Sequence, residues 1–257
     1  MPPRIILNAP GLFIAGTDTD VGKTVVACAI AATLRRQRSG AQIAVGKPFA
    51  TGCRKERGGL VNDDAEALAH FADCRLPLDV INPVRFRAPV APAVAAETDR
   101  TPIDWDAVHS SFEQLQAYGD AVVVEGAGGV MVPLDPAEPT ATWLETRCFG
   151  LPAVVVARAG LGTLNHTALT VKALQGAGVR VAGVVINGYE PDEALAMADD
   201  PARPGNPRWI QRMTGVKVLA LVPRVDPAAA RPAEGVIAPA VLDTVAATDW
   251  WAGMKGE

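Results

Sequence analysis

The residues with the clearest chemical potential form a glycine-bearing turn that ends in lysine and threonine, GTDTDVGKT at residues 16–24. A short apolar run, residues 12–15, precedes the turn, and a helix-like run, residues 25–38, follows it. A strand that leads into a Gly-Lys-Thr turn at the start of a helix is typical of a phosphate-binding loop, because backbone N–H groups and the helix N-terminus face the anion. We therefore expect Lys23 to contact the outer phosphates of a nucleotide and the Thr24 hydroxyl to bind Mg²⁺.

This turn is a variant of the strict phosphate-loop pattern, which places four residues between its first glycine and the Gly-Lys pair. Thr17 occupies the place of the first glycine, and Gly16 stands one residue earlier. A chance turn is the alternative, but the strand, the helix and the spacing together favour a nucleotide site.

Composition limits the class of protein. The chain has 257 residues, of which 49% are hydrophobic, enough to bury a sizeable core, and its net charge is −4. The acidic balance argues against a nucleic-acid partner. No apolar stretch approaches the ~20 residues of a membrane span, and the N-terminus does not read as a secretion signal. Scattered cysteines without a C-x-x-C pair indicate reduced thiols in a cytoplasmic protein.

Short apolar runs alternate with helix-like runs along the chain. Strands are predicted at residues 12–15, 43–46, 121–124, 153–157, 181–186 and 216–222. Helices are predicted at residues 23–38, 63–71, 104–118 and 163–176. This alternation predicts one α/β domain over residues 1–257, a single-domain P-loop NTPase-type fold with a mostly parallel sheet and helices on both faces.

The connecting stretches give further expectations. Residues 54–59 are predicted to be a loop, and the proline-rich residues 76–102 to be irregular. Residues 126–129 are expected to form a tight loop and residues 130–134 a short strand. Helices are also predicted at residues 140–149 and, last in the chain, at residues 237–251.

Charged side chains follow two of the predicted strands directly. Lys47 follows residues 43–46, and Glu125 follows residues 121–124. Ligands of parallel α/β sheets bind beyond the carboxyl ends of the strands, so both side chains are expected near the bound phosphates. Lys47 would supply positive charge there, and Glu125 suits a second Mg²⁺ ligand. A solvated lysine and a surface glutamate before a turn are the alternatives.

Other polar residues are candidates for the same crevice. Thr51 could offer its hydroxyl to the ligand, or be an ordinary loop threonine. Asn62-Asp63 is predicted to be the N-cap of a helix. Of Asp63 and Asp64, one could be the cap and the other could face a metal, or both could be capping or solvated acids. The glycines of residues 126–129 would let the backbone approach a ligand closely.

Two later stretches could also bind ligand. Residues 160–166, GLGTLNH, lead into a helix whose free N–H groups could bind a carboxylate or phosphate, with Thr163 as a plain N-cap the alternative. Asn187 follows a predicted strand and could contact a nucleobase. The Asn-Lys-x-Asp pattern of guanine-specific proteins is absent there, which favours adenine.

Taken together, these stretches resemble the dethiobiotin synthetase family. The matching segments are the loop at residues 16–24, Gly46-Lys47-Pro48, Asn62-Asp63-Asp64-Ala65, Asn82-Pro83, residues 125–129, Pro133-Leu134 and residues 161–166. The resemblance implies a homodimeric ATP-dependent ligase of biotin synthesis. Such an enzyme converts diaminopelargonate, CO₂ and MgATP to dethiobiotin through a carbamate and a carbamic–phosphoric anhydride.

The resemblance also implies a role for individual residues. Catalysis would involve Lys23, Lys47 and Thr51, and Mg²⁺ would be held by Thr24, Asp64 and Glu125. The nucleotide would contact Thr19, Asp20, Val21, Gly22, Lys23, Thr24, Val25, Glu125, Gly126, Gly128, Asn187 and Pro223, with the last two beside adenine. The diamine would contact Thr51 and, across the dimer interface, Gly162, Thr163 and Asn165. Asp20 stands where relatives often carry the longer glutamate.

A partitioning-type dimeric ATPase that binds a macromolecular partner is the main alternative. Such proteins usually carry a lysine early in the phosphate loop, and here Asp18 occupies that place. The acidic net charge also disfavours a DNA partner.

Overall fold

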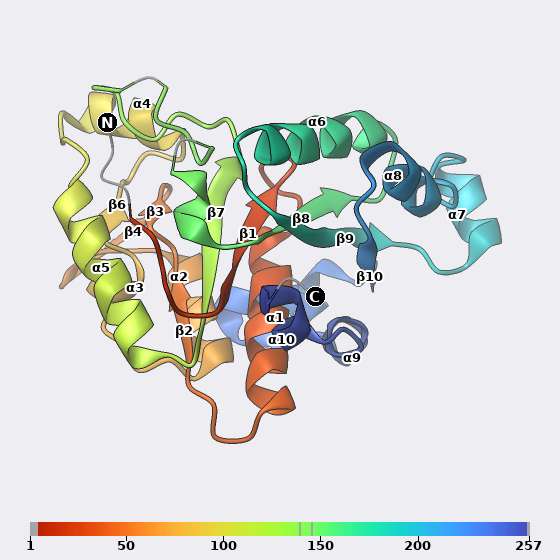
Figure 1. Cartoon of the computed structure of the whole chain (residues 1–257), viewed down its shortest axis with the longest axis horizontal. Coiled ribbons are helices and arrows are strands. Elements are labelled where there is room, and N and C mark those ends of the chain that lie inside the picture. The colour runs from red at the N-terminus through yellow and green to blue at the C-terminus, as the bar shows by residue number, and fades with distance from the viewer. Residues whose placement is uncertain (1–4, 139, 145, 256–257) are drawn as a thin grey trace.

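The structure is a computed structural model that describes residues 5–138, 140–144 and 146–255. Within these residues a six-stranded parallel sheet forms the centre of the molecule (Figure 1). Its strands, in order across the sheet, are β10 (Val218–Pro223), β9 (Val181–Tyr189), β8 (Ala153–Arg158), β1 (Gly11–Gly16), β7 (Ala121–Gly129) and β2 (Ile43–Gly46). The predicted parallel sheet is confirmed, and the strands predicted at residues 12–15, 43–46, 121–124, 153–157, 181–186 and 216–222 correspond to its six strands.

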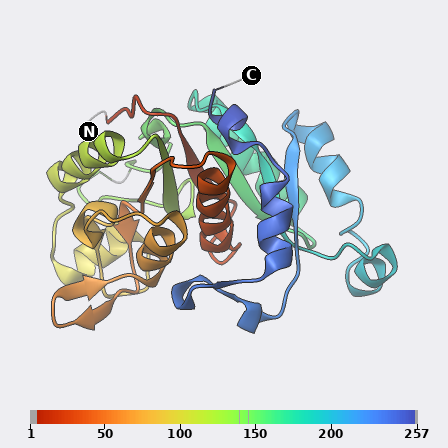
Figure 2. The same cartoon turned by 90° about the horizontal axis from the view of Figure 1, so that it is seen from below.

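Helices cover both faces of the sheet, because successive side chains of each central strand point to opposite sides. In β1, Leu12 and Ile14 belong to one core, while Phe13 and Ala15 belong to the other. The first core lies under α1 (Lys23–Gln37), α2 (Asp63–Ala72), α9 (Pro239–Ala246) and α10 (Trp250–Lys255). The second lies under α4 (Pro92–Asp99), α5 (Trp105–Tyr118), α6 (Thr163–Gly176) and α8 (Asn206–Thr214). In Figure 2 the red-brown α1 and the blue α9 lie side by side on the first face.

The remaining elements are short and lie between these layers or at the edges. They are β3 (Phe49–Ala50), β4 (Arg54–Glu56), β5 (Gly59–Val61), α3 (Leu78–Ile81), β6 (Val84–Arg85), α7 (Glu193–Asp199), β11 (Ala230–Arg231), β12 (Val236–Ile237) and the 3₁₀ turns η1 (Arg147–Gly150), η2 (Pro227–Ala229) and η3 (Pro232–Glu234). None of the helices in the described part of the chain is long and apolar enough to cross a bilayer.

Two stretches expected to lack regular structure do contain it. Residues 54–59 are not a simple loop, because β4 and β5 pair as an antiparallel hairpin around a two-residue Arg57-Gly58 turn. Residues 76–102 contain α3, β6 and α4 rather than irregular chain. Pro92 is compatible with α4 because it lies in the first turn of the helix. Proline has no N–H to donate, and N–H groups in the first turn have no partner within the helix.

The region after Glu125 departs most from the prediction. Residues 126–129 are not a tight loop: they extend β7, with Gly129 opposite Gly16 of β1. No strand forms at residues 130–134. The predicted helix at residues 140–149, of which position 145 lies outside the described residues, is a series of turns ending in η1.

Tertiary packing explains the loss of that helix. Trp143 is buried against Phe13, Phe49 and Phe149, and its indole N–H donates to the Ala127 carbonyl at 2.9 Å. Positive φ values follow at residues 147–149, a conformation that an α-helix cannot adopt.

The predicted last helix, residues 237–251, is divided into α9 and α10. Residues 247–249 interrupt it, and the Thr248 hydroxyl donates to the Leu219 carbonyl of β10 at 3.0 Å. The break directs Trp250 and Trp251 into the core beside α1, where both are buried.

Candidate functional site

The glycine-bearing turn at residues 16–24 connects β1 to α1 at the carboxyl edge of the sheet. Lys23, the first residue of α1, is buried, and its Nζ donates to the Asp18 carbonyl of the same turn at 2.8 Å. A Cβ on Gly16 would stand 2.7 Å from this Nζ, so only glycine leaves room for the lysine. The turn thus carries an ammonium group and the free N-terminus of a 15-residue helix at one point, as a phosphate site requires.

Asn187 holds this turn from the far side. Its Nδ2 donates to the Val21 carbonyl at 3.0 Å, and a Cβ on Gly22 would come within 2.0 Å of the same nitrogen. Gly22 also has a φ of 85°, a conformation that favours glycine. The prediction that Asn187 contacts a base stays a prediction, while its contact with the turn comes from the structure.

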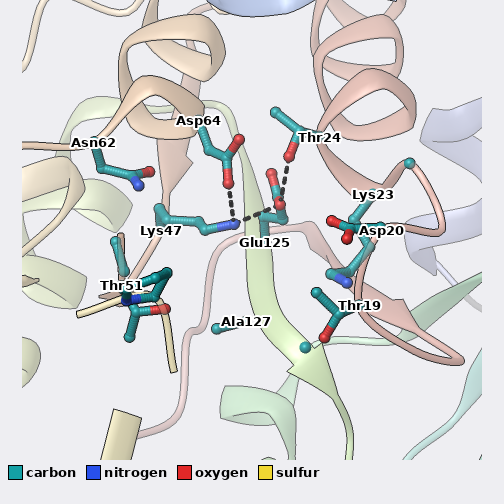
Figure 3. Close-up of a pocket in the computed structure, with 14 residues that line it drawn as sticks. Thr19, Asp20, Lys23, Thr24, Lys47, Thr51, Asn62, Asp64, Glu125 and Ala127 are labelled. Carbon is teal, nitrogen blue, oxygen red and sulfur yellow. Dashed lines mark hydrogen bonds and ion pairs between the residues drawn. The ribbon is translucent and has the colours of Figure 1, made fainter. Parts of the chain in front are cut away.

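Three side chains meet beside this turn in a buried ion-pair cluster (Figure 3). Lys47 Nζ lies 2.6 Å from Glu125 Oε1 and 2.9 Å from Asp64 Oδ2. Gly46 is opposite Val124 in the β2–β7 pairing, so the next residues of the two strands emerge side by side. The Thr24 hydroxyl donates to the same Glu125 oxygen at 2.9 Å and links the cluster to α1.

Burial and charge compete in setting the protonation of this cluster. Burial lowers the pKa of Lys47, but the attraction of Glu125 and Asp64 outweighs it, so the pKa lies above its ordinary value and the ammonium stays charged. Burial raises the pKa of Glu125, and Lys47 offsets only part of this effect. For Asp64 the lysine outweighs burial and the pKa is lowered. Burial also lowers the pKa of Lys23.

The cluster has the donor set that Mg²⁺ prefers, namely oxygens from carboxylates and a hydroxyl. Glu125 Oε2 is buried and makes no hydrogen bond in the described part of the chain, so one carboxylate oxygen is left for a cation. The Asp64 side chain is 40% exposed and borders the same space. Proteins usually bind Mg²⁺ through one or two carboxylates together with substrate phosphates, and Thr24, Asp64 and Glu125 fit that pattern.

A cavity of about 440 Å³ lies over the turn and the cluster. The predicted site residues that line it are Thr19, Asp20, Gly22, Lys23, Thr24, Lys47, Thr51, Asp64, Glu125 and Gly128. A second cavity of about 210 Å³ continues from it past Thr51 and Thr19. The structure therefore brings most of the predicted residues around one space.

Several predicted residues lie outside this cavity. Gly126 packs against Phe13, and Pro223 ends β10 opposite Tyr189. The cavity lining also excludes Val21, Val25 and Asn187, which lie in or beside the turn, and Gly162, Thr163 and Asn165 at the start of α6. Thr163 is not the N-cap of α6, because Gly162 holds that position and Thr163 is the first helical residue.

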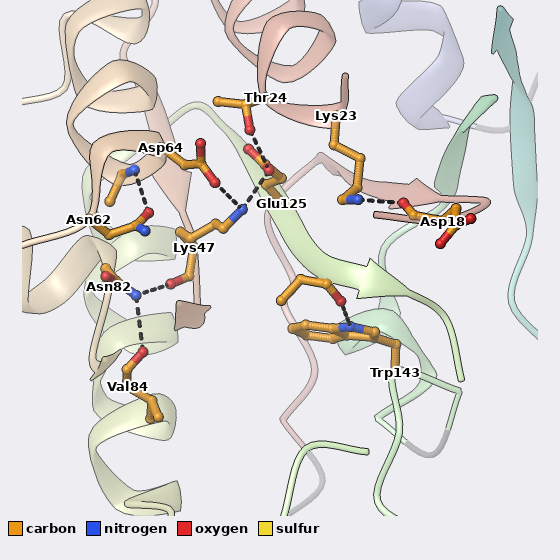
Figure 4. A network of polar contacts seen from close by, with 12 residues as sticks. Asp18, Lys23, Thr24, Lys47, Asn62, Asp64, Asn82, Val84, Glu125 and Trp143 are labelled. Atoms are coloured by element: carbon orange, nitrogen blue, oxygen red, sulfur yellow. Dashed lines mark hydrogen bonds and ion pairs between the residues drawn. The ribbon is translucent and has the colours of Figure 1, made fainter. Parts of the chain in front are cut away.

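The structure adds residues that sequence reasoning did not assign to the site. Pro89 and Ala127 line both cavities, and Asn62, predicted only as a helix cap, lines the larger one. Asn82 is buried and its Nδ2 donates to the Lys47 carbonyl at 2.6 Å and to the Val84 carbonyl at 3.2 Å (Figure 4). The Asn82-Pro83 pair was visible as a motif, but nothing near it in the sequence indicated Lys47 as its partner.

Known proteins have sequences related to this chain. A family model described as an AAA domain matches residues 10–231. ATP-dependent dethiobiotin synthetase BioD of Anaeromyxobacter sp. (strain K) is 46% identical over 214 residues, which are 83% of this chain and 89% of the relative. BioD of Bacillus subtilis (strain 168) is 34% identical over 215 residues, 84% of this chain and 87% of the relative.

Solved structures support the fold at lower sequence identity. The MinD cell division protein of Aquifex aeolicus superposes with a TM-score of 0.56 at 12% identity, over 93% of this chain and 96% of that one. MinD of Pyrococcus horikoshii, solved with Mg-ADP, gives 0.53 at 17% identity, over 93% of each chain. These likenesses establish the P-loop architecture, whereas the sequence relatives match this chain at 34–46% identity over most of their length. The chain therefore belongs to the dethiobiotin synthetase family.

Proposed function

We propose that this protein catalyses the ATP-dependent ring-closing carboxylation of diaminopelargonate with CO₂ to dethiobiotin, a step of biotin biosynthesis. Its BioD relatives support this activity. The observation that carries the proposal is the position of Lys47, whose ammonium lies between Asp64 and Glu125 in the cavity that the phosphate turn also lines. This arrangement supports a role for two lysines, Lys23 and Lys47, in bringing together the two anions that must react.

The chemistry divides into three steps. One amine of the substrate attacks CO₂ and loses a proton, which gives a carbamate. A carbamate oxygen attacks the γ-phosphorus of ATP, and ADP leaves, which gives a carbamic–phosphoric anhydride. The second amine attacks the carbamate carbon and loses a proton, the ureido ring closes, and phosphate leaves with its bonding electron pair.

The protein's task is to hold two anions together, which requires cations and close positioning. Lys23 would contact the outer phosphates, and Lys47 would neutralise charge that develops between the carbamate and the γ-phosphate. The Thr51 hydroxyl, which borders both cavities, would donate to the carbamate. The turn and α1 would bind the remaining phosphates through backbone N–H groups.

We assign the metal site to Thr24, Asp64 and Glu125, supported by the buried Glu125 Oε2, which forms no hydrogen bond with any residue that the structure describes. Mg²⁺ bound there would polarise the phosphates. Asn187 and Pro223, at the ends of β9 and β10, are assigned to the border of adenine. We also propose a cytoplasmic location, which the free, buried cysteines support.

The proposed enzyme is a homodimer in which the first turn of α6 binds the substrate carboxylate held by the other subunit. The cavity of the same chain is not lined by Gly162, Thr163 or Asn165, which supports a role for these residues at the cavity of the partner subunit. Leu161 precedes α6 and is 81% exposed, and Leu169 lies in α6 and is 59% exposed. Exposed apolar side chains of this kind are available for a subunit interface.

The decisive experiment measures phosphate release from MgATP by the purified protein with and without each co-substrate. Turnover should need both diaminopelargonate and bicarbonate. ATP hydrolysis that is equally fast without the diamine would overturn the proposal and favour the partitioning-type ATPase. Lys23→Ala and Lys47→Ala should each remove about 3 kcal/mol of transition-state stabilisation, as for loss of a charge-stabilising donor.

A further inference from the structure

The loop between β8 and α6 is held in place by a segment that the function described so far does not use. This loop, residues 159–162, leads to the first turn of α6, and Gly162 enters the helix with a φ of 90°. Ala159 is buried in the core, but Leu161 is 81% exposed, so the middle of the loop has little core packing. Polar contacts with a neighbouring segment supplement the packing of Ala159.

Two side chains supply those contacts: Asp200, which directly follows α7, and Asn206, the first residue of α8. Asn206 is only 3% exposed, and its Nδ2 donates to the Ala159 carbonyl at 2.8 Å. Asp200 Oδ2 accepts from the Leu161 N–H at 2.6 Å, while Asp200 Oδ1 accepts from the Ala202 N–H at 2.9 Å. One end of the loop is thus held by a buried amide and its middle by a carboxylate.

The fit between the loop and this segment is close. A Cβ on Gly160 would stand 3.1 Å from Asp200 Oδ2, so the glycine lets the carboxylate reach the next N–H. α8 itself is anchored by Ile210, which is buried in the core under α6. Figure 1 shows α8 beside α6 at the β10 edge of the sheet, with α7 on the outer side of α8.

We propose that Asp200 and Asn206 are positioning residues for the substrate's carboxylate. They fix the loop so that the first N–H groups of α6 stay oriented towards that carboxylate. This inference rests on the proposed function, in which those N–H groups bind the diamine's carboxylate. A loop free to shift by about 1 Å would weaken that anchor, because misplacement of this size costs up to two orders of magnitude in other sites. The position of the phosphate-binding turn at residues 16–24 does not depend on this loop.

The test compares Asp200→Ala with Asp199→Ala. Asp199 is the preceding residue and carries the same charge, but its carboxylate pairs with Arg203 and Arg224 and not with the loop. Steady-state turnover is measured with diaminopelargonate varied at saturating MgATP and bicarbonate, and then with ATP varied. Asp200→Ala should raise the diamine KM on the order of tenfold while kcat and the ATP KM stay within about twofold. Asp199→Ala should leave all three near wild type, and Asp200→Asn, which keeps one acceptor oxygen, should fall between.

Amide hydrogen exchange of the peptide that covers residues 159–165 gives a readout independent of turnover. Exchange there should become faster in Asp200→Ala and not in Asp199→Ala. Unchanged exchange in Asp200→Ala overturns the positioning role even if the wild-type protein proves inactive towards the diamine, which is the separate failure of the proposed function. Faster exchange with an unchanged diamine KM, or equal KM changes in both variants, overturns the link to substrate.

Discussion

Lys47 shows how a single residue can combine structural and chemical demands. Its side chain is 5% exposed and lies between two carboxylates, so its charge is compensated inside the protein. The same carboxylates are the proposed metal ligands. A buried ion pair contributes little net stability, but removal of one partner leaves an uncompensated charge. The cluster is therefore sensitive to single substitutions in a way that a solvated ion pair is not.

We expect Lys47→Met to lower the free energy of unfolding by about 3 kcal/mol at pH 8, since Glu125 then stays buried without its cation. Burial already raises the pKa of Glu125, and loss of the lysine would raise it further. The folded state then holds more protons than the unfolded state, so stability falls as pH rises above about 4.3, the ordinary glutamate value. Urea unfolding at pH 5 and pH 8 measures the difference, which should be smaller at pH 5.

The double variant Lys47→Met/Glu125→Gln serves as the control for this prediction. Removal of both charges should recover much of the lost stability, because no unpaired charge remains. Equal stability of the single and double variants at pH 8 would show that Glu125 does not carry the cost.

Gly22 makes a second residue-level prediction, for which Gly40 is a matched control. The two have φ values of 85° and 84°, but a Cβ at Gly40 meets no atom within 4 Å, whereas at Gly22 it meets Asn187. In both alanine variants the left-handed backbone should lower the free energy of unfolding by about 1 kcal/mol. Gly22→Ala alone should also lose ATP binding, measured by calorimetry. Normal ATP binding by Gly22→Ala would mean that the contact with Asn187 does not shape the turn.

At the level of elements, each functional group is carried by a different strand or helix end. Lys47 directly follows β2, and Glu125 lies within the adjacent strand β7. Thr24 lies in the first turn of α1, and Asp64 lies in the first turn of α2. The geometry of the site therefore depends on how the helix starts are fixed. In α2 this is the task of Asn62, whose side chain accepts from the Ala65 N–H at 3.2 Å.

Asn62→Ala should cost about 1 kcal/mol of stability through loss of this cap and should raise the Mg²⁺ concentration needed for half-maximal turnover. Asp104 caps α5 in the same way, through the Ala107 N–H at 2.8 Å, but lies away from the cavity. Asp104→Ala should therefore lose similar stability without a change in Mg²⁺ dependence. Urea unfolding and Mg²⁺ titration of phosphate release measure the two effects. A Mg²⁺ shift shared by both variants would argue against a specific role for the α2 cap.

For the whole molecule, the sheet gathers the carboxyl ends of its strands at one edge, and the site forms there. The part of the proposed site at α6 lies outside the cavity of the same chain, so a second subunit completes it in our proposal. That the full chain, residues 1–257, acts as one domain stays a prediction.

Leu169→Asp should convert the proposed dimer to a monomer, because a charge would replace an exposed apolar side chain of α6 at the interface. Leu195 of α7 is exposed to the same degree, 60%, and Leu195→Asp should leave the dimer intact. Sedimentation velocity distinguishes the two outcomes. A wild-type protein that sediments as a monomer at assay concentrations would contradict the shared site.

The sequence by itself determined those features that depend on neighbours a few residues apart. The phosphate turn, the cap at Asn62, the helix that begins near Asp104 and the apolar runs of the central strands all follow from the local sequence and its periodicity. The strand ends then indicated Lys47 and Glu125, because parallel strands must finish at a common edge. The order of the motifs along the chain indicated the dethiobiotin synthetase family.

Only the tertiary structure decided which distant residues meet. Asn187 lies against Val21, Asn82 against Lys47 and Asp200 against Leu161 through contacts that span 35 to 166 positions. The helix predicted at residues 140–149 failed for the same reason, since burial of Trp143 among three aromatic rings outweighs local helix preference. Local propensity is worth tenths of a kcal/mol per residue, whereas burial of one large aromatic side chain is worth about 2–3 kcal/mol, so packing decides where the two disagree.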